Sequence, residues 1–141
     1  MLLKHGYEVN KPDRNGFTPL MIAVCNGDEN IANMLLRSGA DVNFEANDSG
    51  LTALYIAALI DDRYWVKKLL KYGANKNINT SEDAFKSCVK LAQLYGGPKL
   101  SKYCTFENRN RVKDIIKEEA REIAIQEAII EEKANHMATI K

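Results

Sequence analysis

The sequence has few of the residues that build metal sites and disulfide frameworks. It contains two histidines and three cysteines, and Cys25, Cys88 and Cys104 are widely spaced and form no CxxC pair. This pattern excludes a disulfide framework and a zinc knuckle. His5 and His136 stand near opposite ends, so no local Cys–His catalytic pattern is present. We therefore predict no enzyme activity, no catalytic residue, no cofactor and no metal, and interpret Cys25 and Cys88 as small apolar helix residues.

Long hydrophobic runs and a secretory leader are also missing. The longest apolar run, Leu54 to Ile60, is too short to span a bilayer. The start, MLLKHGYEVN, has no charged leader followed by an apolar core and a cleavage site. The 45% hydrophobic and 28% charged residues are typical of a globular domain. We therefore expect a cytoplasmic protein without a membrane span.

The net charge of +1 is an average over segments of opposite sign. Residues 1–60 carry a net charge of −3, residues 61–117 a net charge of +7, and residues 118–141 a net charge of −3. The middle segment is also rich in aromatic residues, a combination that can bind single-stranded nucleic acid. No RNA- or DNA-binding motif is present, so we favour a protein partner; an acidic protein surface or an anionic lipid headgroup fits the basic segment as well.

An internal repeat is the most informative feature of the sequence. Residues 16–43 align without gaps to residues 50–77 at a shift of 34, and LLKHGYEVN (residues 2–10) matches LLRSGADVN (residues 35–43) at a shift of 33. Each full copy has the signals of two short helices. These are an N-cap threonine (Thr18 or Thr52), a capping aspartate before the second helix (Asp28, and Asp61 or Asp62), and a glycine after it (Gly39 or Gly73).

The repeat unit resembles the ankyrin repeat, whose TPLHxA and LLxxGADVN motifs stand here as TPLMIA and LLRSGADVN. The resemblance covers about residues 1–79. Departures are Met21 and Tyr55 at the usual histidine position, Ala53 for proline and Asp61 for glycine. The resemblance implies an all-α, ankyrin-type helical repeat solenoid with hairpin loops, without catalysis, that binds partners through its loop tips and first-helix face. The corresponding partner-binding positions are Arg14, Asn15, Phe17, Cys25 and Asn26 in one repeat and Asp48, Ser49, Leu51, Leu59 and Ile60 in the next.

The most informative of these positions are the large apolar residues Phe17, Leu51, Leu59 and Ile60. Apolar residues at such positions suggest a hydrophobic contact patch with a polar rim. The alternative is that the closing repeat or the C-terminal helix folds over Leu59 and Ile60.

Beyond Asn79 the repeat decays into a divergent closing unit. We predict a helix over about residues 80–95, with Thr80 and Asp83 as a capping box, and then a short loop, LSKYC. Residues 105–138 contain no glycine or proline and have apolar residues at helical spacing, which predicts one long helix. The expected domains are residues 1–104 and residues 105–141.

The distal part of this helix carries an apolar stripe over residues 123–140. The stripe either lies across the repeats or is exposed for self-association or binding. A basic line of residues 109, 113, 117 and 121 precedes an acidic distal half, which an antiparallel partner with the same pattern would complement. The alternative is a solvated charged face with pairs such as Asp114 with Lys117 and Glu118 with Arg121.

We therefore predict a protein–protein interaction module. The alternatives are a regulatory or targeting fragment of a larger enzyme or effector, because the chain begins inside a repeat unit, and a homo-oligomer assembled through the C-terminal helix. The richness in Lys, Asn and Ile is typical of AT-rich genomes, which adds the alternative of an effector from an intracellular bacterium or virus that acts in the host cytosol.

Overall fold

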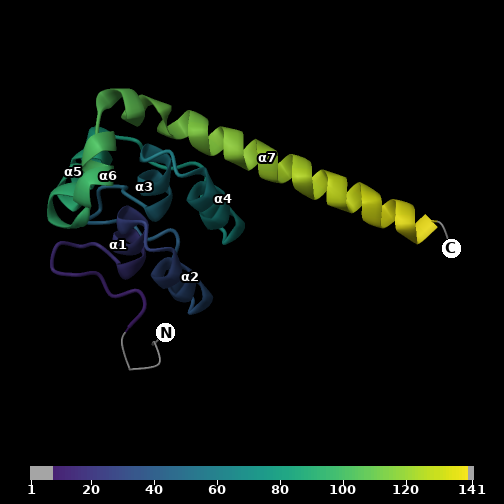
Figure 1. Ribbon diagram of the computed structural model, residues 1–141, viewed down its shortest axis with the longest axis horizontal. Coiled ribbons are helices and arrows are strands. Elements are labelled where there is room, and N and C mark those ends of the chain that lie inside the picture. Colours follow the sequence, from purple (N-terminus) through teal and green to yellow (C-terminus); the bar gives the residue numbers. More distant parts are fainter. Residues whose placement is uncertain (1–7, 140–141) are drawn as a thin grey trace.

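The computed structural model describes residues 8–139, with the side chains of residues 97 and 98 excepted. This part of the chain is all-helical, and its helices form a body from which the last helix projects (Figure 1). The predicted fold class is confirmed. In chain order the helices are α1 (Pro19–Asn26), α2 (Glu29–Arg37), α3 (Ala53–Leu59), α4 (Arg63–Lys71), α5 (Glu82–Tyr95), α6 (Gly97–Tyr103) and α7 (Phe106–Thr139).

The helix pairs α1–α2 and α3–α4 are the two full repeats. Each first helix begins after a threonine whose hydroxyl accepts a hydrogen bond from a backbone N–H three residues later, Thr18 from Met21 and Thr52 from Tyr55, both at 3.3 Å. Each second helix begins after an aspartate that does the same, and in the second copy this residue is Asp62. The capping residues read from the sequence therefore start the helices.

The loop between the repeats is a hairpin-like turn. The backbone N–H of Ala46 donates to the carbonyl of Leu51 at 2.9 Å, and Gly50 has a φ of +87°. A side chain at Gly50 would also place its Cβ 2.7 Å from the side chain of Asn79. The turn therefore requires glycine for both its conformation and its space.

The closing segment differs from the prediction in two places. The first helix of this segment begins at Glu82, and its N-cap is Ser81. The Ser81 hydroxyl accepts a hydrogen bond from the backbone N–H of Ala84 at 3.4 Å. The expected capping box of Thr80 and Asp83 is therefore wrong. Most of the expected LSKYC loop belongs to α6, in which Leu100 is fully buried. Burial of Leu100 supplies a tertiary contact for this helix that local sequence does not show.

The closing helices pack against two different parts of the repeats. Helices α5 and α6 pack against α1, whereas α7 packs against α3 and α4 (Figure 1). As a result, every residue of α3 is buried. One hydrophobic core contains residues of all these helices, including Val112, Ile115 and Ile116 of α7.

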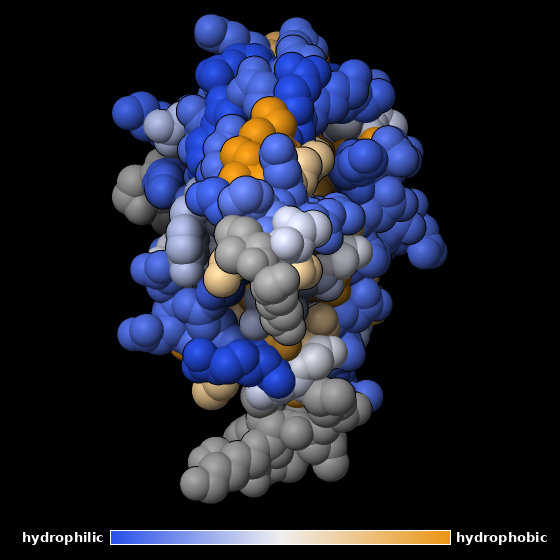
Figure 2. All heavy atoms as spheres, turned by 90° about the vertical axis from the view of Figure 1, so that its right-hand side faces the viewer, coloured by the Kyte–Doolittle hydropathy of each residue, from blue (hydrophilic) through white to orange (hydrophobic). Residues whose placement is uncertain are grey.

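The long C-terminal helix is confirmed as a single helix of 34 residues, about 50 Å at 1.5 Å per residue. Its first half lies across α3 and α4, but its distal half projects beyond the body (Figure 1). Ile130 and Met137 are 65% and 71% exposed. Viewed from the side toward which α7 projects, exposed hydrophobic atoms form a narrow strip among hydrophilic ones (Figure 2). No helix in the described part of the chain is both long and apolar enough to cross a membrane.

Candidate partner-binding surface

Asparagine side chains connect the loops of successive repeats. The Oδ1 of Asn10 accepts from the backbone N–H of Asp41 at 2.6 Å, and the Oδ1 of Asn43 accepts from the backbone N–H of Asn75 at 2.7 Å. The Nδ2 of Asn47 donates to the carbonyl of Asn15 in the preceding loop. These bonds join residues about one repeat apart, so they fix the spacing between neighbouring loops.

Asp13 organises the first loop. One of its carboxylate oxygens accepts from the backbone N–H of Asn15 at 2.9 Å and of Phe17 at 3.0 Å, and the other accepts from the hydroxyl of Tyr95 at the end of α5. Partial burial acts to raise the pKa of Asp13, but these hydrogen bonds outweigh it and hold the pKa below its usual value. Asp13 therefore links the closing helix to the loop that precedes α1.

The predicted partner-binding positions divide into an exposed and a buried group. The exposed or partly exposed side chains are the polar ones: Arg14, Asn15, Asn26, Asp48 and Ser49. The other five are at most 2% exposed: Phe17, Cys25, Leu51, Leu59 and Ile60. The predicted hydrophobic contact patch is therefore wrong, because these side chains lie in the core and cannot reach a partner. These side chains share one core with residues of α5, α6 and α7, and α5 and α6 pack on α1 while α7 packs on α3. The burial agrees with the alternative interpretation of Leu59 and Ile60, in which the closing segment folds over them.

The three cysteines take part in this packing. Cys25 on α1 and Cys88 on α5 are buried, as expected of small apolar helix residues, and Cys104 is partly exposed. Burial, with a smaller effect from Cys104, raises the pKa of Cys25 to about 12. A hydrogen bond with Cys104, together with burial, raises the pKa of Cys88, and the same bond lowers the pKa of Cys104. Sequence spacing gave no sign that these thiols interact.

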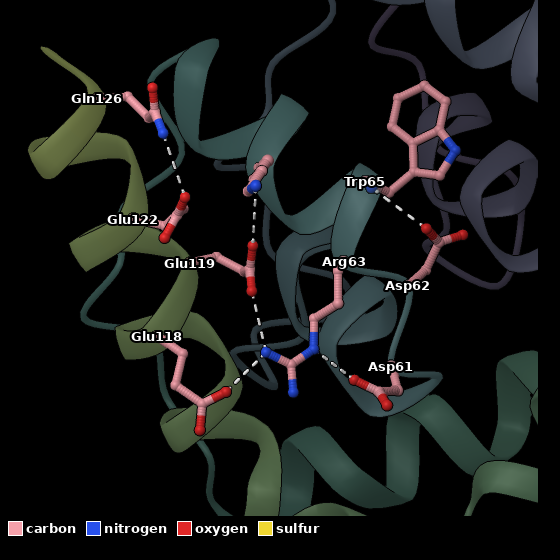
Figure 3. Close-up of polar contacts among 9 residues, drawn as sticks. Asp61, Asp62, Arg63, Trp65, Glu118, Glu119, Glu122 and Gln126 are labelled. Carbon is pink, nitrogen blue, oxygen red and sulfur yellow. Dashed lines mark hydrogen bonds and ion pairs between the residues drawn. The ribbon is translucent and has the colours of Figure 1, made fainter.

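Arg63 connects α4 to α7 through an ion cluster (Figure 3). One guanidinium nitrogen, Nη1, lies 2.7 Å from the carboxylate of Glu118 and 2.9 Å from that of Glu119, while Nε lies 2.6 Å from Asp61. These hydrogen bonds raise the pKa of Arg63 further above its usual value. In the alternative of a solvated charged face, Glu118 pairs with Arg121; in the structure it pairs with Arg63 of α4 instead. Sequence reasoning missed Arg63, whose partners on α7 lie 55 and 56 residues away.

Two stacked helix–turn–helix units joined by turned loops define a helical repeat solenoid. A family profile described as "Ankyrin repeats (3 copies)" matches residues 1–80, and the chain belongs to the ankyrin repeat family. Ankyrin repeats are typically non-catalytic and generally mediate protein–protein interaction.

Several curated proteins are similar to parts of this chain. An ankyrin repeat protein, FPV031, of Fowlpox virus is 40% identical over 86 residues, which is 60% of this chain and 25% of that protein. Alpha-latrotoxin-Lg1a of Latrodectus geometricus is 33% identical over 75 residues, 53% of this chain and 5% of the toxin. Palmitoyltransferase AKR1 of Debaryomyces hansenii is 30% identical over 106 residues, 74% of this chain and 12% of that enzyme. The matches thus span a quarter or less of these relatives.

Proposed function

We propose that this chain is a non-catalytic module that binds a partner protein through the loop tips of its ankyrin repeats. The observation that carries the proposal is the set of asparagine hydrogen bonds between successive loops. Loops that are already fixed relative to one another lose little conformational entropy on binding. The exposed or partly exposed loop positions Arg14, Asn15, Asp48 and Ser49 form the proposed contact set, and Asn26 at the end of α1 is its helical member.

The proposed surface is smaller and more polar than the one that the resemblance implies. The apolar first-helix residues contribute to folding, so they add no binding energy in the folded chain. Arg14 and Asp48 lie in consecutive loops and carry opposite charges. Such a pair favours a partner that places an acidic group opposite Arg14 and a basic group opposite Asp48. It fixes the orientation of the bound partner more than it increases the affinity.

The limits of the functional unit are also a proposal. The first half of α7 shares the core of the repeats, because Val112, Ile115 and Ile116 are buried in it. We propose two parts, residues 1–104 and residues 105–141. The second part is attached to the first because the first half of α7 packs along α3 and α4.

Affinity capture with the intact chain tests the loop surface. We expect the double variant Arg14→Glu/Asp48→Lys to lose a captured partner by at least about tenfold, because charge reversal at an interface costs more than about 1.4 kcal/mol. The matched control, Glu29→Lys/Arg37→Glu, reverses two exposed charges on α2 and should capture the partner as the unmodified chain does. Helical circular dichroism should be unchanged in both variants. Equal capture by both double variants would show that the loop tips are not the binding surface.

A further inference from the structure

A basic groove separates the loop after α4 from the middle of α7. It has a volume of about 630 Å³, and its charged lining consists of Lys76 on the loop side and Lys113, Lys117 and Arg121 on the helix side. Ile78, Ala120 and Ala124 supply its apolar lining. Within residues 8–139, no carboxylate forms an ion pair with these four cationic side chains. The charge of the groove therefore suits an acidic segment.

The same chain carries a segment of this description. Beyond the groove, the projecting arm of α7 (residues 122–139) carries four glutamates and one lysine. Every described side chain from residue 124 to residue 139 is exposed. The arm cannot reach its own groove, because arm and groove belong to consecutive stretches of one straight helix (Figure 1).

The spacing of the charges along α7 matches an antiparallel copy of itself. Lys117 and Glu131 lie seven residues on either side of Ala124, and Arg121 and Glu127 lie three residues on either side. A two-fold axis at Ala124 therefore brings each cation opposite a glutamate of the second copy, giving four ion pairs in total. Ala120 and Ala128, each four residues from the axis, also face each other across it, and small side chains allow close approach of two helices.

We propose that two copies of this chain form an antiparallel dimer in which the arm of each α7 occupies the basic groove of the other. Glu127 of one copy pairs with Arg121 of its partner, and Glu131 pairs with Lys117. Lys76 adds positive charge on the loop side of the groove, where Ile78 forms an apolar wall. The two bodies lie at opposite ends of the helix pair.

Charge reversal on the intact chain tests this pairing by light scattering coupled to gel filtration. At about 100 μM the unmodified chain should have twice the monomer mass of 15.9 kDa, and it should dissociate near 1 μM. These concentrations correspond to a dimer dissociation constant in the micromolar range. Lys117→Glu/Arg121→Glu and Glu127→Lys/Glu131→Lys should each be monomeric at about 100 μM, because like charges then face each other. An equimolar mixture of the two variants should restore the dimer mass, since every pair is complementary again.

Single variants at neighbouring residues provide the matched control. Glu131→Lys should weaken the dimer by at least about tenfold, whereas Glu132→Lys, which lies about 100° further around the helix, should leave it unchanged. A chain that stays at 15.9 kDa throughout this range contradicts the proposal, as does a dimer that both double variants leave intact. Binding of an unrelated acidic peptide by a monomeric chain would assign the groove to a foreign acidic segment and equally overturn self-pairing.

Discussion

Replacing Leu59 with glutamate is expected to unfold this protein. Leu59 is 1% exposed, at the end of a helix whose every residue is buried. A carboxylate in that position would have to stay charged without a partner or bind a proton at neutral pH, and both cost several kcal/mol. We expect a loss of at least about 4 kcal/mol, a large share of the stability of a domain of this size.

Far-ultraviolet circular dichroism during thermal and urea unfolding measures this effect. Leu59→Glu should lack the cooperative transition of the unmodified chain at 25 °C. Asn26→Glu, an exposed position at the end of α1, is the control and should change the unfolding free energy by less than about 0.5 kcal/mol. A folded Leu59→Glu protein with an unchanged transition would place Leu59 on the surface and restore the hydrophobic contact patch.

Replacing Arg63 with alanine is expected to weaken the attachment of α7 to α4. The side chain of Glu119 is only 11% exposed, and without Arg63 its remaining cation is Lys67 at 3.6 Å. A largely buried carboxylate that loses its closest hydrogen-bonding partner costs about 2 to 3 kcal/mol. Glu118 is 57% exposed, so its loss as a partner adds little.

A double-mutant cycle separates these contributions. The variants are Arg63→Ala, Glu119→Ala and the combination, with Glu118→Ala as the exposed control, and the measured quantity is the urea unfolding free energy. We expect a coupling of at least about 1 kcal/mol between Arg63 and Glu119, and a cost below about 1 kcal/mol for Glu118→Ala. Additive effects of the Arg63 and Glu119 substitutions would show that this ion pair does not hold the two helices together.

The features that the sequence predicts well depend on short stretches of chain. The Thr18 and Thr52 caps, the aspartates before the second helices and the absence of glycine and proline from α7 are all read from residues within a few positions of one another. Repetition strengthens these signals, because each copy supplies the same arrangement independently.

The features that the sequence misses depend on contacts between distant segments. Arg63 and Glu119 are 56 residues apart, and Tyr95 and Asp13 are 82 residues apart. The assignment of Phe17, Leu51 and Leu59 to a contact patch assumed that the first-helix face stays open. The structure favours the alternative in which the closing segment folds over Leu59 and Ile60, because α5 and α6 pack on α1 and α7 packs on α3. The periodic apolar residues of α7 predict its helix but not which repeat helices it contacts.

Thiol labelling of the native chain tests most directly the claim that the closing helices cover the first-helix face of the repeats. Cys104 is partly exposed and has a lowered pKa, whereas Cys25 on α1 and Cys88 on α5 are buried with raised pKa values. We predict one fast thiol per chain toward an aromatic disulfide reagent, absent in Cys104→Ser. The other two should react at least about 1,000-fold more slowly, at the rate at which the structure opens. Labelling of Cys25 at the rate of Cys104 would show an open first-helix face and contradict the claim.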